Sequence, residues 1–241
     1  FEPREGPESP AAFNISVTTD YRYRGISQTR LDPALQGGYD KSFSNGIYIG
    51  TWASTIKWIK DAGTILRNNN ITPNDTGSAN VEWDFYGGWK KELVKDLTLD
   101  LGGLYYYYPG NKLADVGAKN ANTFELYGAL SYGPVTAKYS HSLTNLFGTA
   151  DSKGSGYLDV SATFDLGNGW SVLPHVGHQW IKNFSQGSYT DYSLIVGKDL
   201  GKGFNLSVGV YGTDADKNIY VSPENKFLGK SGLVGMLKFN F

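Results

Sequence analysis

The sequence contains no cysteine, which excludes disulfide bonds, thiolate metal sites and a cysteine nucleophile. It contains no run of 18 or more apolar residues, so it offers no transmembrane helix. It has no excess of either charge, with 22 basic and 23 acidic residues, and so gives no indication of a nucleic-acid partner or a basic membrane-binding patch. The lack of cysteine suits a periplasmic or outer-membrane protein.

What the sequence has in abundance is typical of β-structure. Its 31 glycines, 17 tyrosines, 12 phenylalanines and 6 tryptophans favour strands joined by tight turns. Mean hydropathy is negative, at -0.35. That value agrees with a soluble protein, but also with a membrane barrel, because only alternate residues of a barrel strand meet lipid.

Runs that alternate between apolar and polar residues recur along the chain, with turn signals between them. The first run extends from Phe13 to Arg24, with Tyr21 and Tyr23 on the outward face and Arg22 on the inward face beside Arg24. The later runs fall near 33–43, 46–58, 79–91, 97–108, 121–132, 135–145, 156–166, 170–181, 188–200, 204–214 and 228–241, which makes twelve in all.

The connections between these runs alternate between short and long. Five are short and rich in glycine and asparagine, as tight hairpin turns require, and six are long and mostly polar. An even number of strands with short turns at one end and long loops at the other is the pattern of bacterial barrels. The sequence therefore predicts an all-β fold, a 12-stranded antiparallel transmembrane outer-membrane β-barrel over 12–241, preceded by a polar tail over 1–11.

The last run carries Leu233, Leu237, Phe239 and Phe241 on one face and Lys238 on the other. This arrangement resembles the closing strand of bacterial outer-membrane barrels, whose last aromatic residue faces lipid. The resemblance implies an outer-membrane location, and twelve strands with five short turns and six long loops place both termini on the periplasmic side. It also implies that the outer-membrane assembly machinery recognises the strand that ends in Phe241.

Aromatic residues gather near both ends of the runs, as the interfacial girdles of a membrane barrel do. In a soluble sandwich or a lipocalin-like barrel the same residues would fill a core. The charged residues on the opposite faces, and a strand number above that of a lipocalin, favour the membrane barrel. The expected long-loop girdle is Tyr21, Tyr23, Trp58, Trp83, Tyr105, Tyr107, Phe124, Tyr157, Trp180 and Tyr211, and the expected short-turn girdle is Phe13, Tyr39, Phe43, Trp89, Tyr132, Phe164, Phe204 and Phe239.

A family resemblance begins at the motif DYRYRGISQT over 20–29 and continues at QGGY over 36–39 and GTWAS over 50–54. With these motifs the chain resembles the TorF-type outer-membrane porins, a family catalogued as bacterial proteins of unknown function (Gcw_chp). The likeness is looser over 82–88 and 132–139. It implies an outer-membrane barrel and passive solute transport, without naming a solute.

Charged residues on inward faces define the predicted lumen wall, because charges that face hydrocarbon are costly. The predicted wall acids are Asp20, Asp40, Glu82, Asp84, Asp100, Glu125, Asp159, Asp165, Asp191 and Asp199, and the wall bases are Arg22, Arg24, Lys90, Lys138 and Lys238. The excess of acids predicts a modest preference for cations.

Pore-lining or substrate-binding roles are predicted for nine of these residues, namely Asp20, Arg22, Arg24, Asp40, Glu82, Asp84, Asp100, Glu125 and Lys138. Arg22 and Arg24 share a face, and their guanidinium groups suit carboxylate or phosphate ligands. Alternatively, they pair with wall acids such as Asp20, Asp40 or Glu82 and brace the barrel.

The candidate catalytic groups do not assemble into a site. His141 stands between Ser140 and Ser142, but neighbours on a strand point to opposite faces. His175 and His178 also face opposite ways. We therefore expect no enzyme, no cofactor and no metal site.

Twelve strands lie between filled barrels of about 8 strands and open porins of about 16–18. The sequence thus predicts a porin-like channel for passive diffusion of small hydrophilic solutes or ions through a narrow, charged, net-acidic lumen. The alternative is a structural or adhesive outer-membrane barrel with a blocked lumen and functional extracellular loops. The loop over 59–78 either folds inward through Ile65, Leu66 and Ile71 and narrows the mouth, or is a plain surface loop. Expected partners are outer-membrane lipid (lipopolysaccharide or phospholipid) and small hydrophilic solutes, with no nucleic acid.

Overall fold

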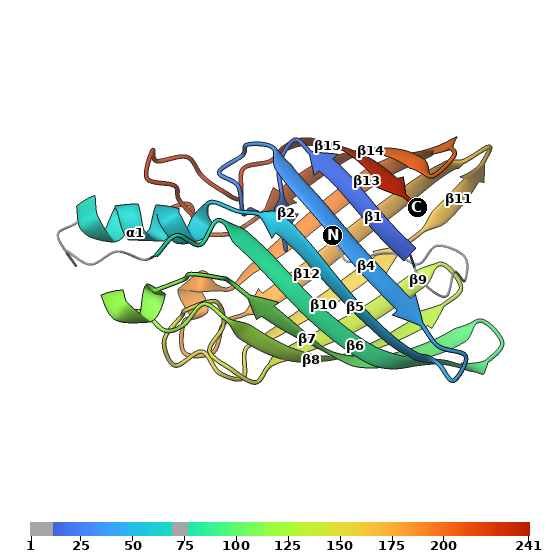
Figure 1. Cartoon of the computed structure of the whole chain (residues 1–241), viewed down its shortest axis with the longest axis horizontal. Helices are drawn as coiled ribbons and strands as arrows, with labels where there is room; N and C mark the ends of the chain where they lie inside the picture. The colour runs from blue at the N-terminus through green and yellow to red at the C-terminus, as the bar shows by residue number, and fades with distance from the viewer. Residues whose placement is uncertain (1–11, 69–76) are drawn as a thin grey trace.

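The computed structural model describes residues 12–68 and 77–241, and its strands form a barrel (Figure 1). The wall strands are β1 (Ala12–Thr18), β4 (Ala34–Ser42), β5 (Ile47–Thr55), β6 (Val81–Val94), β7 (Leu97–Tyr107), β8 (Thr123–Tyr132), β9 (Val135–Ser142), β10 (Gly156–Ala162), β11 (Phe164–Gly167), β12 (Trp170–Trp180), β13 (Tyr189–Gly201), β14 (Phe204–Thr213) and β15 (Gly232–Asn240). β10 and β11 both pair with β12 and occupy one position in the wall. The predicted barrel of twelve antiparallel strands is confirmed, and the tail predicted over 1–11 lies outside the described residues.

The sheet closes on itself at two seams. β10 pairs with β12, and β1 pairs with β15 in a register that sets Ile15 opposite Phe239. The backbone N–H of Phe13 donates to the Phe241 carbonyl, and the N–H of Phe241 donates to the Phe13 carbonyl, each over 3.0 Å. The short turns gather at one end of the barrel and the long connections at the other, where the helix α1 (Trp58–Asn68) projects (Figure 1).

The first predicted strand is too long. β1 ends at Thr18, and the chain then enters the barrel as a short hairpin of β2 (Arg22–Tyr23) and β3 (Ile26–Ser27), which form a sheet of their own (Figure 1). We call residues 20–29 the lumen hairpin. Tyr21 and Tyr23 were expected to face lipid, and that expectation is wrong: Tyr21 is 3% exposed, and the Tyr23 hydroxyl lies 2.7 Å from the Tyr106 hydroxyl.

The outward face of the wall is an apolar band. Large apolar side chains at alternate positions are about half exposed on strand after strand, among them Val17, Leu35, Ile49, Leu126 and Leu194. Among the described residues, no helix is long and apolar enough to cross a membrane. Since a soluble protein seldom exposes a continuous apolar surface of this kind, the band is the face expected to meet lipid.

The apolar band predicts a large penalty for a charge at mid-height. Leu194→Arg, which places a guanidinium on the outward face of β13, should lower the free energy of unfolding in lipid by roughly 2–4 kcal/mol. Leu143→Arg, just beyond β9 near the long-loop end, should cost about 0–1 kcal/mol. Urea unfolding from vesicles measures both, and equal penalties at the two sites would contradict a membrane-spanning wall.

The girdle predictions are partly right. Trp83, Tyr105 and Trp180 are exposed on the outward face near the long-loop end, as expected. Five residues were assigned there wrongly and are instead turned inward or buried in the loops: Tyr21, Tyr23, Trp58, Tyr157 and Tyr211. Their aromatic rings help to fill the interior.

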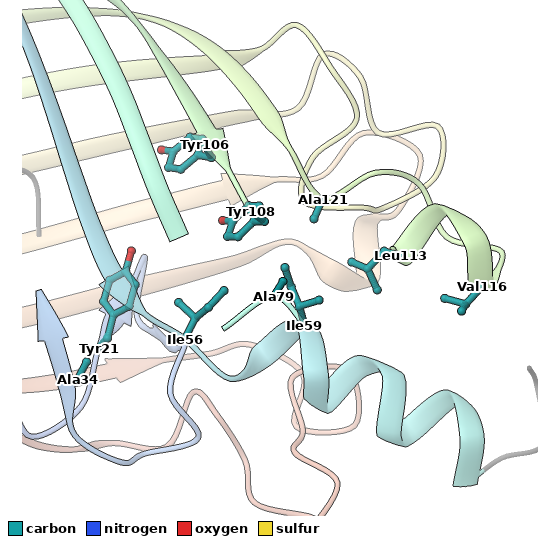
Figure 2. Close-up of a cluster of buried hydrophobic side chains, with 10 residues drawn as sticks. All are labelled: Tyr21, Ala34, Ile56, Ile59, Ala79, Tyr106, Tyr108, Leu113, Val116 and Ala121. Atoms are coloured by element: carbon teal, nitrogen blue, oxygen red, sulfur yellow. The ribbon is translucent and has the colours of Figure 1, made fainter. Parts of the chain in front are cut away.

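Two apolar clusters cover the long-loop end. The larger one, which we call the mouth cluster, contains Tyr21, Ala34, Ile56, Ile59, Ala79, Tyr106, Tyr108, Leu113, Val116 and Ala121 (Figure 2). It joins α1 and the short helix η1 (Leu113–Val116) to the lumen hairpin. Leu66 of α1 packs against it, whereas Ile71 lies outside the described residues.

The smaller cluster joins the hairpin to the opposite loops. Ile26 of β3 packs with Tyr189, Ala215 and Leu228, close to the short helix η2 (Ser185–Gly187). Both clusters therefore hold the lumen hairpin in place from the long-loop end.

Candidate functional site

The turn of the lumen hairpin is formed by Arg24 and Gly25. Both have positive φ, at 46° and 78°, as a two-residue type I′ turn requires. A Cβ added at Gly25 would lie 2.6 Å from the Cβ of Asp191, so the tip of the hairpin touches β13. A side chain at position 25 therefore has no room.

Arg24 reaches across the full width of the barrel. In strand order β9 stands diametrically opposite β1, and Arg24 contacts the strands on both sides of β9. Its guanidinium donates to both carboxylate oxygens of Glu125, over 3.1 and 2.8 Å, and to the side-chain oxygen of Gln179 over 2.7 Å. It also stacks 4.2 Å from the ring centroid of Tyr157. Through these contacts the hairpin spans the lumen from β1 to the opposite wall.

Arg22 points elsewhere, toward the loop before β15. Its Nε donates to Asp20, and its other nitrogens donate to the carbonyls of Gly25 over 3.0 Å and Lys230 over 2.9 Å. Asp20 also accepts from the hydroxyls of Ser27, over 2.5 Å, and Thr29, over 3.2 Å. The structure therefore does not aim Arg22 and Arg24 at one shared ligand.

Ion pairs hold the base of the hairpin at the long-loop surface. Arg30 pairs with Asp61 of α1 and, over 3.1 Å, with Glu224. Lys57 donates to Asp32 over 2.5 Å, and this hydrogen bond holds the pKa of the Asp32 carboxyl below its usual value. These pairs are partly exposed, so each adds little stability alone and weakens with salt.

The predicted wall acids of the long-loop half are buried beneath tyrosines. Glu82 accepts from the Tyr21 hydroxyl over 2.7 Å and from the Tyr108 hydroxyl over 2.8 Å. Asp84 lies two residues along the same face of β6, and among the described residues one of its buried carboxylate oxygens has no hydrogen-bond partner. These acids line the interior but are covered by aromatic rings.

Removing one of these donors should destabilise the barrel. Tyr108→Phe leaves one oxygen of buried Glu82 without its bond and should cost about 1–3 kcal/mol in the free energy of unfolding. The control Tyr107→Phe alters the neighbouring outward position and should change it by less than about 0.5 kcal/mol. Thermal unfolding in detergent compares them, and an equal loss in both variants would show that the buried bond contributes nothing.

The remaining predicted site residues lie closer to the short turns. The Tyr48 hydroxyl donates to Asp100 over 2.6 Å and contacts the Tyr127 hydroxyl. The Lys138 ammonium lies 3.9 Å from the Tyr127 ring centroid. On the adjoining strands, the Tyr86 hydroxyl donates to Asp40. Lys138, Asp100 and Asp40 therefore share this level of the lumen, apart from the hairpin.

Four inward tyrosines lie flat over glycines of neighbouring strands, and sequence reasoning missed them. In each pair a Cβ on the glycine would fall within 2.4 Å of the tyrosine ring or hydroxyl: Tyr48 over Gly88, Tyr86 over Gly50, Tyr127 over Gly102 and Tyr157 over Gly177. The signal was readable, since each glycine occupies an inward position next to the strand that carries the tyrosine. The glycines make room for rings that fill this side of the barrel.

Three of the predicted wall residues, Asp20, Arg22 and Arg24, lie on the lumen hairpin instead of the wall, and two of the predicted wall acids lie outside the lumen altogether. Asp165 and Asp199 are exposed at short turns, where each carboxylate accepts a backbone N–H over 2.7 Å, from Gly167 and Gly201 respectively. Of the ten predicted wall acids, removing Asp165 and Asp199 leaves eight inside the lumen, against five bases, with the hairpin residues included. His175, which the sequence did not place on the wall, joins them inside, 2.8 Å from Asp159 and 3.6 Å from Asp191.

The histidines lie as the strand geometry predicts. His175 faces the lumen, while His178 packs against Trp180 on the outward side, and His141 lies beside Tyr139. Within residues 12–68 and 77–241, no group of three or more His, Cys, Asp or Glu side chains is placed to hold a metal ion.

The family of the chain follows from its sequence. Residues 4–241 match the family described as "Bacterial protein of unknown function (Gcw_chp)". The chain belongs to the Gcw_chp family. A search of curated proteins found none that matches this Gcw_chp chain.

Solved structures similar to this Gcw_chp protein include porins. The KdgM porin has a TM-score of 0.59 at 5% identity, over 95% of this chain and 98% of that one. The NanC porin has a TM-score of 0.58 at 10% identity, with the same coverage. A structure titled "KdgM porin in complex with disordered oligogalacturonate" has a TM-score of 0.53 at 5% identity, over 95% of each chain. At these identities the likeness shows the fold alone, a closed antiparallel β-barrel like those of the KdgM and NanC porins.

Proposed function

We propose that this protein is a porin-like channel of the TorF type, which lets small hydrophilic solutes or ions diffuse passively across the outer membrane. The observation that carries the proposal is a closed wall with an apolar outside and a charged, hydrogen-bonded inside. Such an interior suits water-soluble molecules, and a closed barrel satisfies every backbone group in lipid. The protein acts as a channel rather than as an enzyme.

Charge inside the lumen, on the wall and the hairpin together, sets a weak ion preference in this proposal. Eight acids against five bases leave the lumen net acidic, and charged rings bias the passage of ions. Acidic oligosaccharides, such as the oligogalacturonate named with the KdgM structure, carry a charge on every unit and fit this lumen poorly. Small solutes and cations fit it better.

A second function is favoured by a specific observation. The lumen hairpin crosses the barrel, and two apolar clusters cover its long-loop end. A permanently blocked barrel of this kind would act as a structural or adhesive protein through its extracellular loops.

Transport measurements separate the two functions. Liposomes that contain the purified protein should swell in small hydrophilic solutes and stop swelling as solute size increases, because twelve strands enclose a narrow lumen. Reversal potentials under a salt gradient should show weak cation preference. Liposomes that never swell, in membranes where the protein is folded, would favour the structural barrel, and a clear anion preference would contradict the acidic lumen.

The proposed orientation places the short turns and the described ends of the chain in the periplasm. Lipopolysaccharide or phospholipid would contact the apolar band. The assembly machinery would recognise β15, whose outward side chains include Leu233 and Leu237, together with Phe241, which follows it.

A further inference from the structure

We infer that the outward face of β9, β10 and β12 carries a binding site for a phosphorylated glycolipid, the lipopolysaccharide of the outer leaflet, and that the site holds a phosphate group of this lipid. It lies at the long-loop end of these three neighbouring strands. The inference rests on the orientation proposed above, in which the short turns lie in the periplasm and the long loops outside the cell. It adds a lipid site to the proposed channel and does not depend on conduction.

Two cross-strand rows of side chains form the base of the site. His141 of β9, Gly156 of β10 and Trp180 of β12 stand side by side in one row, and Tyr139 and His178 stand in the next. A Cβ added at Gly156 would lie 2.5 Å from the Tyr139 hydroxyl, so this ring leans over the glycine, and the hydroxyl lies 3.2 Å from Nδ1 of His141. The rings of His178 and Trp180 meet edge to face, with centroids 4.5 Å apart. Aromatic rings with polar edges suit the membrane interface.

Basic groups converge on the loop side of these rows. An atom at the Cβ position of Gly154, in the turn before β10, would lie 3.6 Å from Nζ of Lys182 and 3.9 Å from Cε1 of His141. When the Tyr139 hydroxyl donates to Nδ1 of His141, the imidazole hydrogen lies on Nε2, the atom next to Cε1. Lys153, the residue before Gly154, is exposed and adds a second positive charge to the turn. An ammonium group and an imidazole N–H that face one point are suited to the oxygens of a phosphate.

Hydrogen bonds tie together the two loops that carry the lysines. The backbone N–H of Lys182 donates to Oγ of Ser155 over 3.0 Å. The side chain of Asn183 donates to the backbone carbonyl of Asp151 over 2.9 Å. The backbone beneath the basic groups is therefore held in place before a ligand binds.

The positive charge of the site is not neutralised by acids of the described chain. Within residues 12–68 and 77–241, neither Lys153 nor Lys182 forms an ion pair, although Asp151 lies two residues before Lys153. Across the strands the next acid is Asp214, whose carboxylate accepts the backbone N–H of Thr190 over 2.6 Å. The two lysines thus leave a net positive patch, which is complementary to a phosphate.

The surface next to the site is apolar, as the acyl chains of a lipid require. Leu158, Val160 and Val176 continue the outward face of β10 and β12 toward the short turns, and they are 37%, 37% and 48% exposed. A lipid whose phosphate lies at Lys182 would lay its acyl chains along these residues. Lipopolysaccharide offers both parts, whereas a free phosphate would leave the apolar surface unused.

Lipid binding by charge-neutralised variants tests the site. Lys153→Gln/Lys182→Gln removes both ammonium groups, and Lys41→Gln/Lys198→Gln is the matched control, because it removes two lysines that lie over aromatic rings near the short turns. Native mass spectrometry of the detergent-solubilised barrels, titrated with lipid A that carries both phosphates, gives the dissociation constant of each protein. Since a lysine near an anionic lipid surface contributes about five-fold, Lys153→Gln/Lys182→Gln should bind roughly 25-fold more weakly than the wild type. The control variant should bind as the wild type does.

Lipids of different chemistry identify the ligand. Lipid A without phosphates should bind equally to the wild type and to Lys153→Gln/Lys182→Gln, and phosphatidylglycerol should bind the wild type more weakly than phosphorylated lipid A does. If Lys153→Gln/Lys182→Gln binds phosphorylated lipid A as tightly as the wild type, the site is overturned. Equal wild-type affinity for phosphatidylglycerol and lipid A would also overturn it, in favour of a general attraction for anionic lipids.

Two further measurements separate folding and conduction from lipid binding. The heat-dependent shift in gel mobility shows which variants are folded, and if the double variant does not fold, Lys182→Gln alone should lose about five-fold in affinity. Planar-bilayer conductance tests the channel and not the site. Wild-type barrels that carry no current, yet bind lipid A through these lysines, would contradict the proposed function and support the lipid site.

Discussion

Arg24→Ala should raise the conductance of the barrel several-fold. Arg24 holds the tip of the lumen hairpin against β8 and β12, through Glu125 and Gln179. Without the guanidinium, the hairpin tip loses its attachment to the opposite wall and is free to move out of the lumen. Single-channel currents in planar bilayers measure the effect, and Lys217→Ala, on an exposed loop position, should match the wild type.

Arg24→Ala also leaves the buried carboxylate of Glu125 without its ion-pair partner. The free energy of unfolding of the variant must therefore be measured along with its conductance. Leaving Glu125 unpaired costs about 3–5 kcal/mol for a buried pair. The double variant Arg24→Ala/Glu125→Gln removes the unpaired charge of Glu125. It should recover part of the lost stability while keeping the larger current. An Arg24→Ala protein that is folded and conducts like the wild type would show that the hairpin does not obstruct the lumen.

Gly25→Val should prevent the hairpin tip from packing against β13 and sharply lower the yield of folded barrel. The new Cβ would meet Asp191 at 2.6 Å, and the positive φ adds strain of about 1–2 kcal/mol for any L-residue. Gly201→Val is the matched control, because Gly201 has a φ of 81° with no atom within 4 Å of the added Cβ. The heat-dependent shift in gel mobility of folded barrels measures the yield.

The comparison between these two glycines isolates the contact inside the lumen. Gly201→Val should keep most of its folded yield, because it introduces backbone strain but no steric clash. Equal yields for the two variants would indicate that the hairpin tip does not pack against β13 as the structure has it.

The barrel wall was predictable from sequence, because each strand alternates between lipid and lumen and the turns carry glycine or asparagine. Phe239 outward and Lys238 inward are examples, and the predicted strand boundaries lie close to those of β4 to β15. The lumen hairpin was not predictable in this way. Tyr21, Arg22, Tyr23 and Arg24 continue the alternation of β1, and alternation cannot distinguish a wall strand from a hairpin inside the barrel. The Arg24-Gly25 pair was the missed turn signal.

The candidate site was predictable in its residue types but not in its pairings. Charges on inward faces do lie inside, as Glu82, Glu125 and Asp100 show. Which partner each one finds depends on neighbours across the barrel that are distant in sequence, such as Arg24 and Gln179. The helix within the predicted 59–78 loop was missed for a different reason: the spacing of Ile59, Ala62 and Leu66 on one face of α1 is readable in the sequence but was overlooked among turn residues.

The most direct test of whether the hairpin obstructs a solute channel compares two currents. Residues 20–31 are replaced by a short glycine-rich turn, which joins β1 to β4 where Thr18 already pairs with Ala34. Single-channel conductance is then recorded for both folded proteins in planar bilayers. A solute channel crossed by the hairpin should show a small conductance in the wild type and a several-fold larger one without the hairpin. Equal conductance in the two proteins, or none in either, would contradict a solute channel crossed by the hairpin.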